Sequence, residues 1–333
     1  MRDRACPTTH LTSPPAGRER NDSMTTRTLQ LLAMSTLTAV ALAACAPSEA
    51  QPSDQSNTQV ETSTSSKDAS DHQRLEKQLK KLEDRYDARV GVSAFDTESG
   101  ESVDHRADER FGFASSLKAF AVAELLDRTT PKELEKNVTW TQADVDEAGW
   151  TPVTDKHVDD GLPLEDVAES ALRVSDNLAM NIVLDELGGP EALDDAMEKD
   201  GDTTTEVTDE EPELNDVEEG STDNTTTPAA FTANLQGLLD AKRLSDDDRK
   251  VLFDWMSANE TGDPLIRAGA PEGWVVRDKS GHSDAIQNDI AMVTPPDRKP
   301  IVLSVMTETD DPESEDGPAM VAAVAEAVLT EFE

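Results

Sequence analysis

FGFASSLKAF, residues 111–120, opens an apolar segment that is rich in Ala and Leu. This pattern predicts a helix over about 115–127. Residues three positions apart on a helix lie on the same face, so the Ser115 hydroxyl and the Lys118 amine would lie within hydrogen-bond reach of each other.

This spacing suits one kind of chemistry. A serine hydroxyl is a weak nucleophile until a neighbouring base takes its proton. Lysine can be that base when burial or nearby positive charge lowers its pKa, and the first turn of a helix directs backbone N–H groups at an oxyanion. Ser115 and Lys118 are therefore a candidate acylating pair. The alternative is an N-capping serine followed by a solvated lysine, and the motif alone does not decide.

The flanking segments predict the fold class. A long polar passage over about 200–224 has no helix or strand period and is expected to be a loop, of the length that tends to be functional. Strands and a helix at each chain end surround a run of helices, which predicts an α/β part with an antiparallel sheet flanked by helices and an all-helical inserted domain. The expected α/β part is about 72–108 and 260–333, and the helical part about 109–259. Within them we expect a helix to Tyr86, strands at 89–95, 274–279, 289–293 and 301–306, and a last helix over 318–332.

Three further motifs follow in an order that a serine acyl-transfer site would use. Ser175-Asp176-Asn177 precedes a helix, Glu211-Pro212-Glu213-Leu214-Asn215 lies in the long loop, and Lys279-Ser280-Gly281 ends a C-terminal strand. Each alone has an ordinary explanation, as a helix cap, a solvated loop or a strand end. Together they are specific.

With these motifs, the chain from about His72 to its C-terminus resembles the class A serine β-lactamases. Trp150-Thr151-Pro152-Val153-Thr154 belongs to the resemblance. By it, Ser115 attacks the lactam carbonyl, and Lys118 and Glu211 are both candidate bases for acylation. Glu211 and Asn215 would position the water that hydrolyses the acyl-enzyme.

The resemblance also implies the substrate contacts. Ser175 would relay a proton to the lactam nitrogen, and Asn177 would hold the side-chain amide of the substrate. Lys279 and Ser280 would face its carboxylate. The N–H groups of Ser115 and His282 would form the oxyanion hole, and Trp150 would line the mouth of the cleft.

Two departures from the family pattern concern the loop and the carboxylate. The family commonly braces the long loop with an Arg–Asp ion pair at the positions of Asp209 and Asn224. That ion pair cannot form here, so we expect a more mobile loop and deacylation slower than acylation. No arginine occupies the usual carboxylate-binding positions, one of which is Leu265. Arg267 and Arg277 are near in sequence only, so carboxylate binding would rest on Lys279 and Ser280.

Composition limits the partners. The formal net charge is −40, from 70 acidic and 30 basic residues, which argues against a nucleic-acid partner because a phosphate binder needs a basic face. The chain has two cysteines, Cys6 and Cys45, so no disulfide or thiolate metal site is expected after residue 45. The five histidines show no i, i+4 pairing, and we expect neither a metal nor a cofactor.

The N-terminal segments indicate export. We expect Met24 to be the true start, with 1–23 an upstream artefact, and 24–44 to be a signal peptide. Leu42-Ala43-Ala44-Cys45 resembles a bacterial lipobox, with Cys45 as the lipidated residue; the alternative is an ordinary signal peptide with an incidental cysteine. Residues 45–71 are polar and predict a flexible tether. The expected location is the outer face of the bacterial cytoplasmic membrane, or the medium after release.

Two other functions remain open at this point. A penicillin-binding D,D-peptidase shares the Ser-x-x-Lys, Ser-x-Asn and Lys-Ser-Gly motifs, but Glu211 and Asn215 favour the hydrolase. A lipoprotein that has kept the fold and lost the activity is the second alternative. The expected partner is a small β-lactam, bound by a monomer.

The acid excess also predicts a response to salt. Distributed negative charge is self-repulsive, and added ions screen that repulsion, so the midpoint of thermal unfolding should rise as NaCl is added. A thermal melt at each salt concentration measures this. A midpoint that stays constant or falls would contradict a surface adapted to high salt.

Overall fold

The computed structural model describes the backbone from residue 65 onward and the side chains from His72 onward. The predicted upstream segment, the signal peptide, Cys45 and most of the predicted tether lie outside these residues. A five-stranded antiparallel sheet is at the centre of the described part, in the order β2-β1-β9-β8-β7. Its strands are β1 (Ala88–Asp96), β2 (Ser102–His105), β7 (Val275–Ser283), β8 (Ile286–Thr294) and β9 (Ile301–Thr309). Both chain ends therefore contribute to one sheet, as the sequence predicts.

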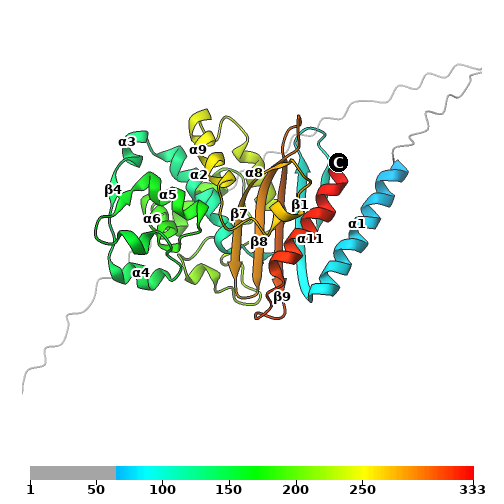
Figure 1. Ribbon diagram of the computed structural model, residues 1–333, viewed down its shortest axis with the longest axis horizontal. Helices are drawn as coiled ribbons and strands as arrows, with labels where there is room; N and C mark the ends of the chain where they lie inside the picture. The colour runs from blue at the N-terminus through cyan, green and yellow to red at the C-terminus, as the bar shows by residue number, and fades with distance from the viewer. Residues whose placement is uncertain (1–64) are drawn as a thin grey trace, which may run out of the picture. The chain divides into compact units, whose positions relative to one another are not determined.

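Two long helices cover one face of this sheet. They are α1 (Ser65–Tyr86) and α11 (Gly317–Leu329), which lie side by side although they come from opposite ends of the chain (Figure 1). Leu75 and Leu79 of α1 and Val321 and Val324 of α11 are buried in one apolar cluster with alternate residues of the strands. The face of the sheet on which they pack is thus closed to water.

The helical part packs against the other face and extends away from it (Figure 1). Helix α8 (Pro228–Leu238) packs against β1 and β9, where Thr232 Oγ1 donates to Ser93 O at 2.9 Å. The other α-helices of this part are α2 (Lys118–Arg128), α3 (Pro131–Leu134), α4 (Gln142–Ala148), α5 (Leu164–Arg173), α6 (Asn177–Leu187), α7 (Pro190–Lys199) and α9 (Asp246–Ser257). The short helix α10 (Ile266–Gly269) instead packs against α11, and its Ile266 is buried in the apolar cluster of that face.

Short strand pairs complete the helical part. They are β3 (Phe111–Gly112) with β6 (Thr225–Thr226), and β4 (Asn137–Val138) with β5 (Leu162–Pro163). The first pair joins the segment before Ser115 to the far end of the long loop. It therefore links the two stretches that carry Ser115 and Glu211.

The predicted elements are confirmed at most positions. Thr227 and Ser245 cap α8 and α9, because the two hydroxyls accept from Ala230 N and Asp248 N. Helices α3, α4 and α7 were not predicted. The sequence contained the signals: α3 and α4 open with capping boxes at Thr130 and Thr141, and α7 opens with a proline at its first turn.

The N-terminal boundary needs a correction. Helix α1 begins at Ser65, so 65–71 belong to the helix and not to the predicted tether. These residues are polar and carry no apolar period, which is why the sequence pattern placed the start at His72. In the described part of the chain, no helix is both long and apolar enough to span a membrane.

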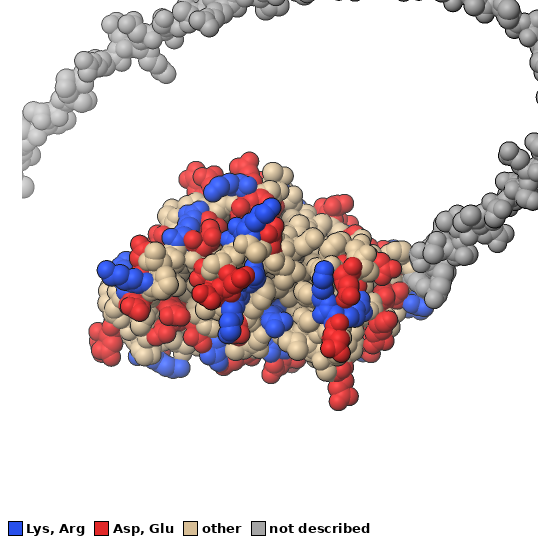
Figure 2. Space-filling model, turned by 90° about the horizontal axis from the view of Figure 1, so that it is seen from above, with Lys and Arg blue, Asp and Glu red and all other residues tan. Residues whose placement is uncertain are grey.

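The charge excess is visible at the surface. Acidic side chains are spread over the face seen in Figure 2, and basic side chains are interspersed among them. Such a distribution leaves no broad basic face on this side of the molecule.

Candidate active site

Ser115 lies in a single tight turn that strands β7 and β8 hold in place. Residues Ala114–Leu117 form a 3₁₀ helix that runs into α2, and Ala114 has φ of +45°. Asn288 of β8 donates to Gly112 O at 2.8 Å and to Phe113 O at 3.3 Å. A Cβ on Gly281 of β7 would lie 2.9 Å from Phe113 O and from Ser116 N, so only glycine lets this strand pass the turn so closely.

The Ser115 hydroxyl is hydrogen-bonded to Glu211 and not to Lys118. Ser115 Oγ donates to Glu211 Oε1 at 3.1 Å, and no hydrogen bond joins it to Lys118 Nζ in the described structure. The predicted closeness of Ser115 and Lys118 is therefore not realised as a direct hydrogen bond. The two side chains share Glu211 instead, because Lys118 Nζ lies 2.9 Å from the same Oε1.

Lys118 is a fully buried ammonium group. Its Nζ donates to Ser175 O at 2.9 Å, to Asn177 Oδ1 at 2.7 Å and to Glu211 Oε1 at 2.9 Å. Three acceptors at these distances use three N–H groups, which only the charged form of lysine has. Burial lowers the pKa of Lys118, and the charge of Glu211 opposes that shift.

Glu211 is held from three sides. Asn181 of α6 binds its backbone twice, by donating to Glu211 O at 2.7 Å and accepting from Glu211 N at 2.8 Å. Asn215 Nδ2 donates to Glu211 Oε2 at 2.7 Å. Burial raises the pKa of Glu211, but the charge of Lys118 and the hydrogen bonds to the carboxylate outweigh it, so the pKa lies below its usual value. Glu211 is ionised at neutral pH.

Ser175 lies between two lysines. Its Oγ is 3.4 Å from Lys118 Nζ and 3.1 Å from Lys279 Nζ, and its φ is +58°. Ser175 Oγ accepts from Lys279 Nζ, whereas the N–H groups of Lys118 are directed at closer acceptors, so the Ser175 proton is free for another partner. That arrangement suits the predicted proton relay. Asp176 caps α6 through Ala179 N and also accepts from Val153 N and Thr154 N, which fixes this turn against the 150–154 stretch.

One cavity of about 440 Å³ brings most of the predicted residues together. Trp150 is 60% exposed at this cavity, and its Nε1 donates to Val174 O. The lining residues are Ser115, Trp150, Ser175, Asn177, Glu211, Asn215, Thr261, Pro264, Leu265, Ser280, His282, Gln287 and Pro318. Lys118 and Lys279 are completely buried and act from beneath the surface of the cleft. Asn177 is already engaged with Lys118 and, through Nδ2, with Ala148 O.

The expected carboxylate end of the cleft contains no arginine. Arg267 donates to Asp278 Oδ1 at 2.5 Å and to Met256 O at 2.9 Å, and Arg277 donates to Thr294 Oγ1 at 3.4 Å. Sequence reasoning missed two polar residues here, Thr261 and Gln287. Thr261 Oγ1 lies 2.6 Å from Ser280 Oγ, and Gln287 Nε2 donates to Gly281 O at 3.3 Å. Nothing in the sequence around Thr261 marks it, since it reaches Ser280 only through the fold.

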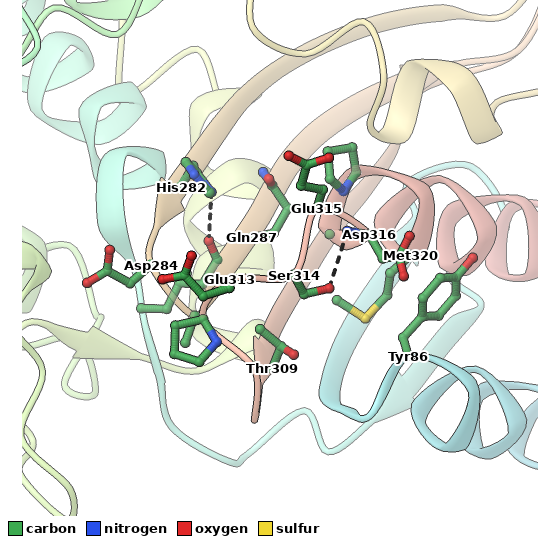
Figure 3. Close-up of a pocket in the computed structure, with 15 residues that line it drawn as sticks. Tyr86, His282, Asp284, Gln287, Thr309, Glu313, Ser314, Glu315, Asp316 and Met320 are labelled. Carbon is green, nitrogen blue, oxygen red and sulfur yellow. Dashed lines mark hydrogen bonds between the residues drawn. The ribbon is translucent and has the colours of Figure 1, made fainter.

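A second cavity of about 550 Å³ adjoins this end (Figure 3). It shares His282, Gln287 and Pro318 with the cleft. His282 Nδ1 lies 3.2 Å from Ile286 O, which holds the imidazole over the β7–β8 turn. Asp284, Glu313, Glu315 and Asp316 also line this cavity, so negative charge surrounds the expected carboxylate end.

The ends of the long loop are joined in an unexpected way. The Arg–Asp ion pair is absent, but Asn224 Nδ2 donates to Asp209 Oδ2 at 2.7 Å. Asn224 Oδ1 accepts from Thr208 N at 3.1 Å and from Asp209 N at 3.2 Å, and Asn224 O accepts from Phe113 N. The absence of the ion pair is as the sequence predicts, and the mobility of the loop and the slower deacylation stay predictions. A hydrogen-bonded Asp–Asn brace occupies the two positions.

Comparison with known proteins agrees with this geometry. The model of the Beta-lactamase enzyme family matches residues 74–332. The chain is 42% identical over 250 residues to Beta-lactamase 3 of Bacillus cereus, covering 75% of this chain and 78% of that protein. The chain belongs to the β-lactamase family.

Similarity to solved structures shows the class of β-lactamase to which the chain belongs. The class A beta-lactamase from Clostridium kluyveri DSM 555 has a TM-score of 0.75 and 36% identity, covering 78% of this chain and 98% of that one. A halotolerant bacterial beta-lactamase has a TM-score of 0.73 and 37% identity, covering 76% and 98%. Within the family, the chain is a class A serine β-lactamase with the predicted α/β and all-helical fold.

The hydrogen bond between Asp209 and Asn224 predicts how exchanging these two side chains changes kcat. In Asn224→Asp a second carboxylate would face Asp209, and the repulsion should loosen the loop and lower kcat about tenfold. Aspartate has the shape of asparagine and, like asparagine, tolerates a positive φ. The reciprocal double variant, Asp209→Asn with Asn224→Asp, returns one amide and one carboxylate and should recover most of the loss. Equal defects in the single and double variants would contradict the brace.

The lowered pKa of Lys279 predicts that kcat/KM for a substrate with a carboxylate depends on pH. Burial and the charge of Lys118 lower the pKa of Lys279 to about 7, so it loses its positive charge as the pH rises through that value. For benzylpenicillin, kcat/KM, which reports the free enzyme, should therefore fall above about pH 7. The methyl ester of benzylpenicillin is the matched control, because it has no carboxylate. The same pH profile for acid and ester would contradict this role.

Proposed function

We propose that the chain hydrolyses the β-lactam ring of penicillins and cephalosporins through an acyl-enzyme on Ser115, and so confers antibiotic resistance. The observation that carries this proposal is the direct hydrogen bond from Ser115 Oγ to the buried, ionised Glu211 within the cleft. A hydroxyl that already donates to a carboxylate is poised to lose its proton to it.

In acylation, Glu211 takes the Ser115 proton as Oγ bonds to the lactam carbonyl carbon. The C–N bond of the ring then breaks, and Ser175 delivers its proton to the leaving nitrogen. Lys118 gives a proton to the Ser175 oxygen and receives the proton held by Glu211, so Ser175 is a hydroxyl and Glu211 a carboxylate again before deacylation. Lys118 stays an ammonium group and stabilises the Glu211 carboxylate before the proton moves. This assignment chooses Glu211 over Lys118 as the base, because the lysine has no lone pair while it serves its three acceptors.

In deacylation, Glu211 and Asn215 act on a water molecule. Asn215 Nδ2 is committed to Glu211 Oε2 and Pro212 O, whereas its Oδ1 is buried without a donor from the described protein. That oxygen can accept one O–H of a water whose second proton goes to Glu211. The water oxygen attacks the ester carbonyl, and Ser115 regains its proton as the product acid leaves.

These residues favour hydrolysis over the D,D-peptidase alternative. A peptidase that shares the serine and lysine motifs is blocked by penicillin because its acyl-enzyme persists. Glu211, ionised and oriented by Asn181 and Asn215, supplies the base that clears the ester. The same complete set of residues argues against a catalytically silent relative.

We further propose that the enzyme works outside the cell as a monomer. The apolar run before Cys45 and the small residues beside it support an exported, lipid-anchored protein held at the outer face of the cytoplasmic membrane. Mass spectrometry of the mature protein, looking for a diacylglyceryl group on Cys45, tests the anchor. A mature chain cleaved elsewhere without lipid would leave an ordinary secreted enzyme.

The number of penicillin molecules turned over by each enzyme molecule distinguishes a hydrolase from a penicillin-binding peptidase and from a silent relative. Wild type should hydrolyse benzylpenicillin through many cycles, while Ser115→Ala should lose activity by at least about 10³-fold. Glu211→Gln should form an acyl-enzyme that persists, seen as a mass increase equal to one penicillin. Wild type that stops after one equivalent would mean a penicillin-binding protein, and no covalent adduct at all would mean a silent relative.

A further inference from the structure

Two buried carboxyl groups lie under the strand that carries Lys279 and Ser280. Asp289 of β8 pairs with Ser280 of β7, and Asp278 pairs with Ala291. Paired residues in an antiparallel sheet point to the same face, so Asp278, Ser280, Asp289 and Ala291 share one face. Ala291 belongs to the apolar cluster under α11, and both aspartates are completely buried.

The two carboxyl groups differ in their partners. Both oxygens of Asp278 are engaged, Oδ1 with Arg267 Nε at 2.5 Å and Oδ2 with Asn259 Nδ2 at 2.6 Å. Asp289 Oδ2 accepts only the Ile266 N–H, at 3.0 Å, and its Oδ1 is buried with no donor among the described residues. Asp289 has no ion pair within the described structure.

An ionised Asp289 at this place would be costly. Lys279, the neighbouring cation on β7, donates to Ser175 Oγ and Ser280 O. Arg267 of α10 is bound to Asp278, β9 places Val305 opposite Asp289, and the buried residues of α11 are apolar. Two adjacent buried carboxylates, of which only Asp278 is ion-paired, repel each other in a medium that disfavours charge.

We propose that Asp289 is a positioning residue, held as the neutral acid beside the Asp278 carboxylate, that fixes the 259–267 wall of the cleft against β7 and β8. In this form Asp289 carries the proton and no charge, so it does not repel the Asp278 carboxylate. Burial and the charge of Asp278 both raise the pKa of Asp289 well above its usual value, in agreement with the geometry.

The pair acts on the wall through two sets of contacts. Asp289 holds Ile266 and thereby Leu265, which lines the cleft. Asp278 holds Asn259, whose Oδ1 accepts from Thr261 N at 3.0 Å and from Thr261 Oγ1 at 2.7 Å. Thr261 in turn meets Ser280, so the polar group that faces the substrate depends on the buried pair.

A neutral Asp289 predicts the direction in which the stability of the protein changes with pH. A group whose pKa is raised by folding stabilises the protein while it is protonated, and this stabilisation is lost as the pH rises through the raised pKa. Asp289→Asn keeps an oxygen for the Ile266 N–H and cannot ionise. Asp289→Leu has a similar size and offers no acceptor.

The test compares the full chain with these two variants from pH 6 to 10. Asp289→Asn should keep kcat/KM within about threefold at neutral pH and lose less thermal stability than wild type at alkaline pH. Asp289→Leu should raise KM about tenfold at every pH, because the Ile266 N–H is left without a partner. Lys279 titrates in both the wild type and the asparagine variant, so the difference between them isolates Asp289.

Two outcomes would overturn the proposal. One is an Asp289→Asn variant whose stability falls with pH as steeply as that of wild type. The other needs no variant: in wild type labelled with ¹³C at aspartate carboxyl groups, no carboxyl remains protonated at pH 7 by NMR. The kinetic arm rests on the proposed function, whereas the stability and NMR arms do not, so failure of hydrolysis would be distinguishable from failure of this inference.

Discussion

The buried contact between Lys118 and Glu211 is the constraint on which the site depends. Two opposite charges removed from water are tolerated only when their remaining hydrogen-bonding groups are satisfied. Ser175 and Asn177 accept from Lys118, and Ser115 and Asn215 donate to the Glu211 carboxylate; all four residues line the cleft. Loss of either charge would leave the other unpaired in the interior, at a cost of about 3–5 kcal/mol. Stability and chemistry therefore require the same residues.

The fold is arranged to bring these two charges together. Lys118 begins α2, and Glu211 lies in the long loop. The β3–β6 pair and the Asn224–Phe113 hydrogen bond join the loop to the turn before Ser115. The sheet forms the opposite wall, where Gly281 and Asn288 bring β7 and β8 against the same turn. Each of these contacts joins segments that are distant in sequence.

Sequence could predict the types of the elements and the residues with chemical roles. The strands at both chain ends and the motifs at Ser115, Ser175, Glu211 and Lys279 depend on local patterns, and the cavity contains or overlies them all. The partners of those residues could not be predicted. Spacing on a helix suggested that Lys118 would bind Ser115, but the low-dielectric interior favours the pairing of Lys118 with Glu211, which approaches from the loop. Asn181, Thr261 and Asp289 have no local signature, because each acts across a tertiary contact.

Departures from a family pattern are also hard to evaluate without the structure. Asp209 and Asn224 cannot form an ion pair, and the sequence alone therefore predicts a more mobile loop. An amide that donates to a carboxylate can join the same two positions, since the link needs complementary hydrogen-bonding groups and not opposite charges. The arginine missing from the carboxylate end has no such replacement in kind. Neutral groups of Thr261, Ser280 and Gln287 lie there instead, above the buried charge of Lys279.

The most direct test of the account is the rate of acylation in single-turnover experiments, compared between wild type and Glu211→Gln. If Glu211 is the base that takes the Ser115 proton, acylation should slow by about 10²–10⁴-fold, in addition to the loss of deacylation. Acylation at the wild-type rate, with only deacylation lost, would contradict the account and assign the proton transfer to Lys118.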